Sequence, residues 1–203
     1  MSSAWPTTGI PMPSSWRNKT VFLDRDGVIN QDSPEYIKSW AEFHFIPGSL
    51  DAIARLTQSG FAVIVITNQS AINRRMVPLT RLKAMHGKLR QAVSDSGGRI
   101  TDLFVCPHRP DEHCNCRKPK PGLIFAARDR YDIDLASAVM VGDSVKDILA
   151  GKAAGCGRTV LVKTGNGRSA IQSLEKIGRP PDHVAADLNR AVRWILAPHH
   201  EPG

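Results

Sequence analysis

The segment VFLDRDGVIN, residues 21–30, decides the fold, because in it an apolar run leads directly into two aspartates separated by one residue. The run has the character of a buried strand that ends at Asp24. That places Asp24 at the carboxyl end of the strand, where open α/β sheets bind ligands. Gly27 then lets the backbone turn away. Two carboxylates this close repel each other and require a cation or a shared proton. We therefore interpret Asp24 as a nucleophile beside a Mg²⁺ site and Asp26 as its acid–base partner; an Asp-Gly turn after an edge strand is the alternative.

Length and composition suit one domain with a substantial core, since the chain has 203 residues, of which 41% are hydrophobic and 23% charged. A formal net charge of +8 and a pI near 9.6 favour anionic partners: phosphorylated metabolites, nucleic acid or acidic lipid. No apolar run approaches the ~20 residues that cross a membrane, and the start of the chain lacks a secretory signal. We predict a cytoplasmic protein without a membrane partner. It would have a flexible extension at 1–19, one domain at 20–198 and a tail at 199–203.

Apolar, mostly β-branched runs recur along the chain and alternate with segments of helical spacing. Further strands are predicted at 61–66, 103–105, 138–141, 159–162 and 182–185. Helices are predicted near 50–56, 82–93, 123–130 and 188–196. Such alternation predicts an α/β fold with a doubly wound, Rossmann-like, mostly parallel sheet and helices on both faces.

Polar side chains follow the predicted strands. The sequence Thr-Asn-Gln-Ser occupies residues 67–70, Asp143 follows a later strand, and Lys118 lies in a loop. Asp147 lies one helical turn after Asp143, so both can face the same site. Because the carboxyl ends of parallel strands share one edge, these groups can meet Asp24 there. Together they are the set that phosphoryl transfer requires, since the protein must neutralise charge and align the attack. A plain turn is the alternative for residues 67–70.

Three of the four cysteines fall within residues 106–116, with the spacing of Cys106, His108, Cys114 and Cys116. This clustering favours a metal site over a disulfide framework and agrees with a reducing cytoplasm. Three thiolates and an imidazole suit tetrahedral Zn²⁺, and four protein ligands leave no position for water, so we predict a structural zinc. It would hold the loop that presents Arg117 and Lys118. His113 is an alternative ligand to His108, and an unmetallated cluster is the alternative to zinc.

Two further features are interpreted from pattern alone. Residues 31–45 lack steady periodicity and contain four aromatic residues. We interpret this segment as a flap over the site, with a short hairpin packed into the core as the alternative. His86, on the predicted helix at 82–93, is interpreted as a surface or packing residue rather than a ligand.

Five motifs carry a resemblance to known proteins: FLDRDGVIN (22–30), VITNQS (65–70), CPH (106–108), CNCRKPKPG (114–122) and VGDSVKD (141–147). They resemble the phosphatases of the haloacid dehalogenase superfamily, over nearly the whole chain after about Thr20. More narrowly, the chain looks like the D-glycero-D-manno-heptose-1,7-bisphosphate phosphatases and the related histidinol-phosphate phosphatases.

The resemblance implies specific roles. Asp24 would attack phosphorus and form an aspartyl-phosphate, and Asp26 would protonate the leaving alkoxide and then activate water. Mg²⁺ would be held by Asp24, the backbone carbonyl of Asp26 and Asp143, with Asp147 supporting the metal and the lysine. The remaining residues would bind the phosphoryl group or the sugar: Thr67, Asn68, Lys118, Asp32, Tyr36, Gln69, Ser70 and Arg117.

The function that the resemblance implies is removal of the 7-phosphate of the heptose bisphosphate, a step toward nucleotide-activated heptose for bacterial lipopolysaccharide. A monomer acting on a small phosphorylated metabolite is expected. The alternatives are a histidinol-phosphate phosphatase, a nucleic-acid end phosphatase and a non-catalytic zinc module that binds nucleic acid. Nucleic acid is not an expected partner, because no basic stretch is interleaved with aromatic residues. The complete set of catalytic residues argues against a module that has lost catalysis.

Two departures from the family pattern bear on the substrate. Residues 71–75 read Ala-Ile-Asn-Arg-Arg, where the heptose phosphatases usually have Gly-Ile-Ala-Arg-Gly, so two glycines are missing. Ser144 follows Asp143, where some relatives carry a lysine.

Overall fold

The structure is a computed structural model that describes residues 17–198. Residues 1–16 of the predicted extension and the predicted tail at 199–203 lie outside this range. The rest of the extension contacts the domain. The Lys19 carbonyl accepts a hydrogen bond from the Ala62 amide at 2.8 Å, and Arg17 lies 3.5 Å from the Asp132 carboxylate. None of the helices within residues 17–198 has both the length and the apolar character that a membrane crossing requires.

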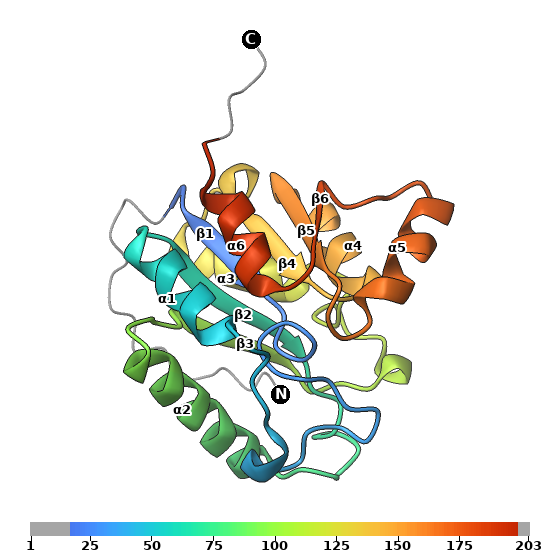
Figure 1. The fold of residues 1–203 in the computed structure, drawn as a ribbon. Coiled ribbons are helices and arrows are strands. Elements are labelled where there is room, and N and C mark those ends of the chain that lie inside the picture. The colour runs from blue at the N-terminus through green and yellow to red at the C-terminus, as the bar shows by residue number, and fades with distance from the viewer. Residues whose placement is uncertain (1–16, 199–203) are drawn as a thin grey trace.

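A six-stranded sheet forms the centre of the molecule, in the order β3-β2-β1-β4-β5-β6 (Figure 1). Every pairing is parallel, so the predicted parallel sheet is confirmed. The strands are β1 (Thr20–Leu23), β2 (Ala62–Asn68), β3 (Asp102–Cys106), β4 (Val139–Gly142), β5 (Arg158–Val162) and β6 (His183–Ala185). The chain winds outward from β1 to β3 and then returns to the other side of β1 for β4. This reversal creates a crevice at the carboxyl ends of β1 and β4.

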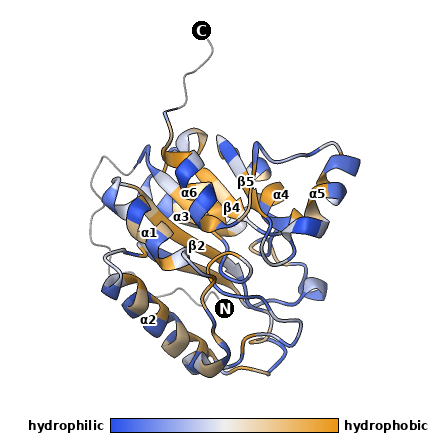
Figure 2. Ribbon diagram, viewed as in Figure 1, coloured by the Kyte–Doolittle hydropathy of each residue, from blue (hydrophilic) through white to orange (hydrophobic). Residues whose placement is uncertain are grey.

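Helices cover both faces of the sheet, as predicted. On one face lie α1 (Ser49–Gln58), α2 (Leu79–Asp95) and α6 (Leu188–Leu196); on the other lie α3 (Gly122–Tyr131), α4 (Val145–Ala154) and α5 (Gly167–Lys176). Figure 2 shows the hydrophobic residues concentrated in the central strands. The sequence analysis gave bounds for neither α4 nor α5. Short 3-10 helices lie at Trp40–Glu42, Pro110–Glu112 and Leu135–Ser137.

Strand β1 connects the two cores because successive side chains point to opposite faces. Val21 and Leu23 pack in the core formed with α1, α2 and α6, whereas Phe22 packs in the core formed with α3 and α4. All three are fully buried, and burial of each such side chain stabilises the fold by about 1.5–3 kcal/mol. The strand is thus fixed from both sides, which fixes the position of Asp24 at its end.

The chain turns sharply after β1. The Asp24 amide still donates to the Val141 carbonyl at 3.0 Å, so the crevice begins with this residue. Gly27 has a φ of +80°, and a Cβ there would lie 2.1 Å from Oδ2 of Asp143. Glycine is therefore needed both for the turn and for the close approach of the second strand end.

Residues 31–45 form an irregular loop that is closed at its base. The Gln31 amide donates to the His44 carbonyl at 2.8 Å. Trp40, Phe43 and Phe45 pack together with ring centroids 4.9 to 5.9 Å apart. Both interpretations of this segment describe part of it, since its aromatic residues pack against the core while its first limb, which includes Asp32, lines the crevice.

Candidate active site

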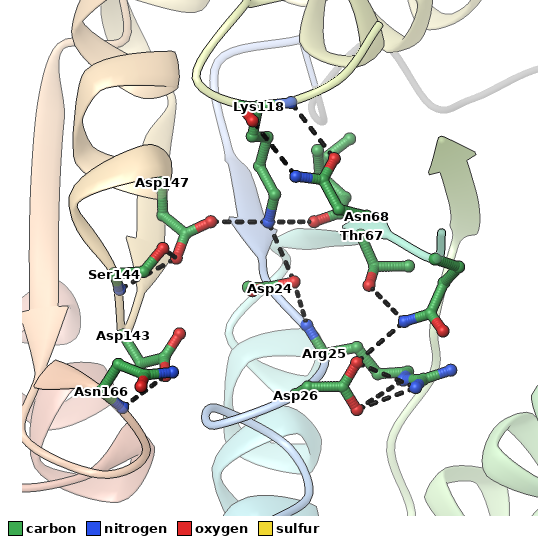
Figure 3. Close-up of polar contacts among 12 residues, drawn as sticks. Asp24, Arg25, Asp26, Thr67, Asn68, Lys118, Asp143, Ser144, Asp147 and Asn166 are labelled. Atoms are coloured by element: carbon green, nitrogen blue, oxygen red, sulfur yellow. Dashed lines mark hydrogen bonds and ion pairs between the residues drawn. The ribbon is translucent and has the colours of Figure 1, made fainter. Parts of the chain in front are cut away.

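Lys118 is the central cation of the crevice (Figure 3). Its Nζ lies 2.9 Å from Oδ1 of Asp24 and 2.6 Å from Oδ1 of Asp147, and it donates to the Ile66 carbonyl at 2.8 Å. An ammonium has three donors, and these contacts occupy all of them. Burial works against the charged form, but Asp147 and Asp24 outweigh it and raise the pKa of Lys118 above its ordinary value. Lys118 is therefore a fixed positive charge beside the predicted nucleophile.

Asn68 places Lys118 although the lysine lies in a loop. The side-chain amide of Asn68 donates to the Lys118 carbonyl at 3.2 Å and accepts from the Lys118 amide at 3.1 Å. Asn68 ends β2, so this pair of bonds attaches the loop to a rigid strand. Because both ends of the amide are occupied, Asn68 acts here through Lys118, and its direct contact with substrate stays a prediction.

Asp26 points away from Lys118 and toward the side chain of Arg25 (Figure 3). Its Oδ1 accepts from Arg25 Nε at 3.1 Å, Arg25 Nη2 at 2.8 Å and Asn30 at 2.9 Å. Its Oδ2 accepts from Arg25 Nη2 at 2.9 Å and from Gln69 at 2.8 Å. Gln69 also donates to the Thr67 hydroxyl at 2.9 Å. Burial would raise the pKa of Asp26, but the Arg25 charge and these hydrogen bonds outweigh it and lower that pKa.

Asp143, at the end of β4, completes the acidic set. Its Oδ2 accepts from the backbone and side-chain nitrogens of Asn166 at 2.8 and 3.3 Å, and a Cβ at Gly165 would lie 2.1 Å from the same oxygen. Burial, and then the negative charge of Asp147, raise the pKa of Asp143 to about 7. The carboxylate is thus held firmly through Oδ2 in surroundings that disfavour its charge.

The residues present fit a magnesium ion. Asp24, Asp143 and Asp147 each offer a carboxylate oxygen, and these oxygens lie within 4.8 Å of one another. Burial raises the pKa of Asp24 well above its ordinary value; Lys118 opposes the rise and the neighbouring carboxylates add to it. A hard cation with oxygen ligands would remove this repulsion. Asp147 accepts from the Ser144 amide at 3.0 Å and binds Lys118, so it positions its neighbours, which agrees with its predicted supporting role.

The Cys and His side chains of residues 106–116 converge on one point. The Sγ atoms of Cys106, Cys114 and Cys116 lie 3.3 to 3.6 Å apart, and His108 Nδ1 lies 3.2 Å from Cys116 Sγ. Tetrahedral zinc with bonds of about 2.3 Å separates its sulfur ligands by about 3.8 Å, so the residues fit that ion. The group contains His108 and not His113, which favours His108 as the fourth ligand.

A cavity of about 300 Å³ opens at the crevice. Its size is at the lower end of small-molecule sites. Its lining includes every residue predicted for catalysis, substrate or magnesium: Asp24, Asp26, Asp32, Tyr36, Thr67, Asn68, Gln69, Ser70, Arg117, Lys118, Asp143 and Asp147. The structure therefore brings the whole predicted set to one place.

Comparison with known proteins agrees with this geometry. A family model described as "HAD-hyrolase-like" matches residues 115–191. The chain is 48% identical, over 88% of its length and 98% of the relative, to the D-glycero-beta-D-manno-heptose-1,7-bisphosphate 7-phosphatase of Bordetella bronchiseptica. It is 50% identical to the protein of that name from Pseudomonas putida, over 88% of this chain and 99% of the relative. The chain belongs to this phosphatase family.

Solved structures of family members share the fold of this phosphatase. The B. bronchiseptica enzyme, crystallised with magnesium and phosphate, has a TM-score of 0.82 at 45% identity and covers 88% of this chain and 98% of its own. The enzyme from Burkholderia thailandensis has a TM-score of 0.68 at 37% identity and covers 89% and 99%. The predicted family and the predicted class, a phosphoric monoester hydrolase of the haloacid dehalogenase superfamily, are therefore confirmed.

Sequence analysis gave no role to four side chains of the phosphatase site: Arg25, Asn30, Lys146 and Asn166. Arg25 and Asn30 lie within the motif that was singled out, but only the carboxylates of that motif had been given roles. Asn166 bonds both Asp143 and Asp32, the latter at 3.0 Å. It follows β5, so the rule that polar residues after a strand face the crevice would have found it.

Proposed function

We propose that this phosphatase removes the 7-phosphate of D-glycero-D-manno-heptose 1,7-bisphosphate, with Mg²⁺ as cofactor, in the synthesis of nucleotide-activated heptose. The observation that carries the proposal is the placement of Asp24 in the cavity, between the fixed charge of Lys118 and the carboxylate of Asp26. Close identity to relatives that bear this activity in their names supports the choice of substrate.

In the first step an oxygen of Asp24 attacks phosphorus, and the bond from phosphorus to the C7 oxygen breaks. Asp26 gives its proton to the departing alkoxide, which leaves as an alcohol. Lys118 and the Thr67 hydroxyl stabilise the charge on the phosphoryl oxygens. Since the pKa of Asp26 is lowered in the free protein, the required proton enters with the substrate phosphate.

In the second step water attacks the phosphorus of the aspartyl-phosphate and gives its proton to Asp26, and the bond from phosphorus to Asp24 breaks. The hydrogen bonds around Asp26 suit this step, because they favour the ionised carboxylate that accepts a proton. The proton on Asp26 passes to the departing phosphate, so phosphate carries away the proton that entered with the substrate and both aspartates return to their ionised starting forms.

Mg²⁺ would be held by Asp24, the backbone carbonyl of Asp26 and Asp143. When bound, it would neutralise the carboxylates and the phosphoryl oxygens. A relative of this chain was crystallised with magnesium and phosphate, and the convergence of Asp24, Asp143 and Asp147 supports the same cofactor here.

Zinc would be held by Cys106, His108, Cys114 and Cys116, with a structural role. The sequence continues directly from the last ligand into Arg117, whose Nη1 donates to the His108 carbonyl at 3.0 Å. The ion would therefore stiffen the segment that carries both Arg117 and Lys118 into the cavity.

The second phosphate of the substrate would meet positive charge on the cavity wall. Arg117 and Lys146 both line the cavity. Some relatives have a lysine at the position of Ser144, and here Lys146, two residues later, supplies a lysine to the same cavity. The altered loop at residues 71–75 contributes nothing to the cavity lining, which ends at Ser70 on that side. The departure from the family pattern therefore lies outside this cavity, which is compatible with the heptose assignment.

The decisive measurement is kcat/KM with Mg²⁺ for the two anomers of heptose 1,7-bisphosphate, histidinol phosphate and a 3′-phosphorylated oligonucleotide. We expect a preference of ~100-fold or more for one heptose anomer, which is about 2.7 kcal/mol of transition-state discrimination. A flat profile, or higher activity on histidinol phosphate, would remove the heptose assignment and leave the phosphatase mechanism in place.

A further inference from the structure

Arg25 lies between the two catalytic aspartates in sequence, yet its side chain is buried beneath the site. The residue is 0% exposed, and its guanidinium contacts three separate segments. It binds Asp26, it lies over the Phe43 ring at 5.7 Å, and its Nη1 lies 3.2 Å from Nε2 of His86 on α2. A guanidinium is buried only where its charge and donors find partners. The partners around Arg25 therefore fix the position of its side chain.

The contact with His86 has one possible direction. A guanidinium has only donors, so Nε2 of His86 is the acceptor and the ring proton is on Nδ1. His86 is only 8% exposed. Burial, and then the nearby charge of Arg25, lower the pKa of His86 to about 3. The imidazole is therefore neutral at physiological pH, and its Nε2 lone pair is available to Arg25.

Fixing one end of a guanidinium fixes the other, because the group is planar. With Nη1 bound to His86, the Nε and Nη2 donors are directed at Asp26. Arg25 and Asn30 hold Oδ1 of Asp26, and Arg25 Nη2 and Gln69 hold Oδ2. Both oxygens of the carboxylate are thus anchored, and Oδ2 lies on the side of Gln69, a residue of the cavity lining.

We propose that His86 is a positioning residue for the phosphatase reaction: acting through Arg25, it fixes the orientation in which Asp26 delivers its proton to the leaving group. The proposal rests on the acid role of Asp26 given above. It assigns a function to α2, which otherwise contributes only apolar side chains to the core.

The choice of leaving group separates this role from a general loss of structure. A primary alkoxide requires a proton to depart, whereas the phenolate of p-nitrophenyl phosphate does not. Since kcat/KM covers the steps up to departure of the leaving group, a misplaced acid lowers it for the alkyl phosphate alone. The alkyl substrate is heptose 1,7-bisphosphate, with histidinol phosphate as a second primary alkyl phosphate.

We expect His86→Leu, which removes the acceptor, to lower kcat/KM for the alkyl phosphates by about 10- to 100-fold and for p-nitrophenyl phosphate by less than about 3-fold. His86→Gln can place an amide oxygen near the position of Nε2, and we expect it to restore the alkyl activity to within about 3-fold of wild type.

If His86→Leu does not fold, His86→Asn takes its place, since its amide is one methylene too short to reach Arg25. Val93→Ala, a buried change on the same helix, should lower Tm without changing the ratio between the two substrate types.

Equal losses on the alkyl and aryl phosphates, full alkyl activity in His86→Leu or His86→Asn, or no recovery in a folded His86→Gln would each overturn the proposal. Wild-type activity on heptose bisphosphate tests the proposed function, and only the ratio within the variants tests His86. If histidinol phosphate is turned over and heptose bisphosphate is not, the proposed substrate is wrong, while the ratio still decides the role of His86.

Discussion

The phosphatase has two clusters of metal-binding side chains, and they are built in opposite ways. The acidic cluster joins residues more than a hundred positions apart, Asp24 and Asp143, at the ends of two neighbouring strands. The cysteine cluster lies within eleven consecutive residues, 106–116, and only its first ligand belongs to a strand. In the acidic cluster the protein also supplies a cation, Lys118, whereas the described contacts of the cysteine ligands are mainly with one another.

The two clusters therefore differ in what holds their side chains in place. The positions of the aspartates follow from the sheet and its two apolar cores, so the acidic cluster persists when its charge is removed. The cysteine segment contains one 3-10 turn, Pro110–Glu112, and its ligands are its main internal contacts. We therefore expect loss of a catalytic carboxylate to remove activity and preserve the fold, and loss of a thiolate to remove order first.

Asp24→Asn gives the largest expected effect and tests whether the acidic cluster is needed for activity but not for the fold. It removes the nucleophile, so kcat should fall by about four orders of magnitude or more. The amide keeps the shape of the side chain and relieves the repulsion among buried carboxylates, so Tm should not fall. Steady-state kinetics with Mg²⁺ and a thermal melt check both outcomes.

Asp129→Asn is the matched control, because the Asp129 side chain is 65% exposed and lies outside the cavity lining. It should leave kcat and Tm unchanged. Retention of substantial turnover by Asp24→Asn would exclude Asp24 as the nucleophile, and unfolding of that variant would contradict the view that the sheet alone places it.

Cys114→Ser tests the other cluster. The variant should lose its zinc and about 2–4 kcal/mol of unfolding free energy, since the segment loses its main internal contacts. Activity should fall by about 10-fold because Arg117 and Lys118 follow the zinc segment. Metal analysis, a thermal melt and kcat/KM measure the three effects.

Cys156→Ser is the control, because Cys156 is a partly buried cysteine packed in the core between the sheet, α3 and α4 and lies outside the cluster. It should keep its zinc content and nearly full activity. A Cys114→Ser protein that is free of zinc and as stable as wild type would refute the structural role of the metal.

The two histidines of these regions also differ in their surroundings. His108 lies among cysteine side chains, whereas His86 is buried as a neutral base with its pKa lowered to about 3 from an ordinary 6.5. Between these values the unfolded chain binds a proton that the folded chain does not, so stability falls as pH decreases below about 6.5. Above that pH the His86 imidazole is neutral in both the folded and the unfolded chain, and it no longer affects stability.

We therefore expect His86→Gln to flatten the pH dependence of unfolding. Between about pH 7 and about pH 4.5, wild type should lose about 2 kcal/mol more than the variant. Urea unfolding at several pH values measures this difference. Parallel curves for the two proteins would mean that His86 is not buried as a neutral base.

The parts of the site that were predictable from sequence are those governed by local patterns. Apolar runs followed by polar residues located the strand ends, and the cysteine spacing located the second cluster. The partnership of Arg25 and His86 was not predictable, because 61 positions separate them and neither has a pattern of its own. Helix α5, by contrast, was predictable by the same rule, because Ala170, Ile171 and Leu174 follow helical spacing and pack in one apolar cluster.

Residues 71–75 show another limit of prediction from sequence. The sequence showed that a glycine was missing, but the effect of its loss depends on the backbone conformation at that position. Arg75 occupies a position where related phosphatases have glycine, and its φ is 59°. A left-handed conformation costs a residue with a side chain about 1–2 kcal/mol. The missing glycine thus affects stability rather than the cavity, which this loop does not line.

Arg75→Gly is the smallest of the expected effects and tests this interpretation. Relief of the left-handed strain, offset by the greater entropy of glycine in the unfolded chain, should stabilise the fold by about 0.5–1 kcal/mol. The control is Arg74→Gly, which removes the same charge from an exposed neighbour that lacks a positive φ, and it should be neutral or destabilising. Urea unfolding of both variants measures the difference. If the two glycine variants shift stability equally, charge rather than backbone conformation distinguishes this loop. If only Arg75→Gly is stabilised and kcat/KM is unchanged, the departure from the family pattern has been accommodated outside the site.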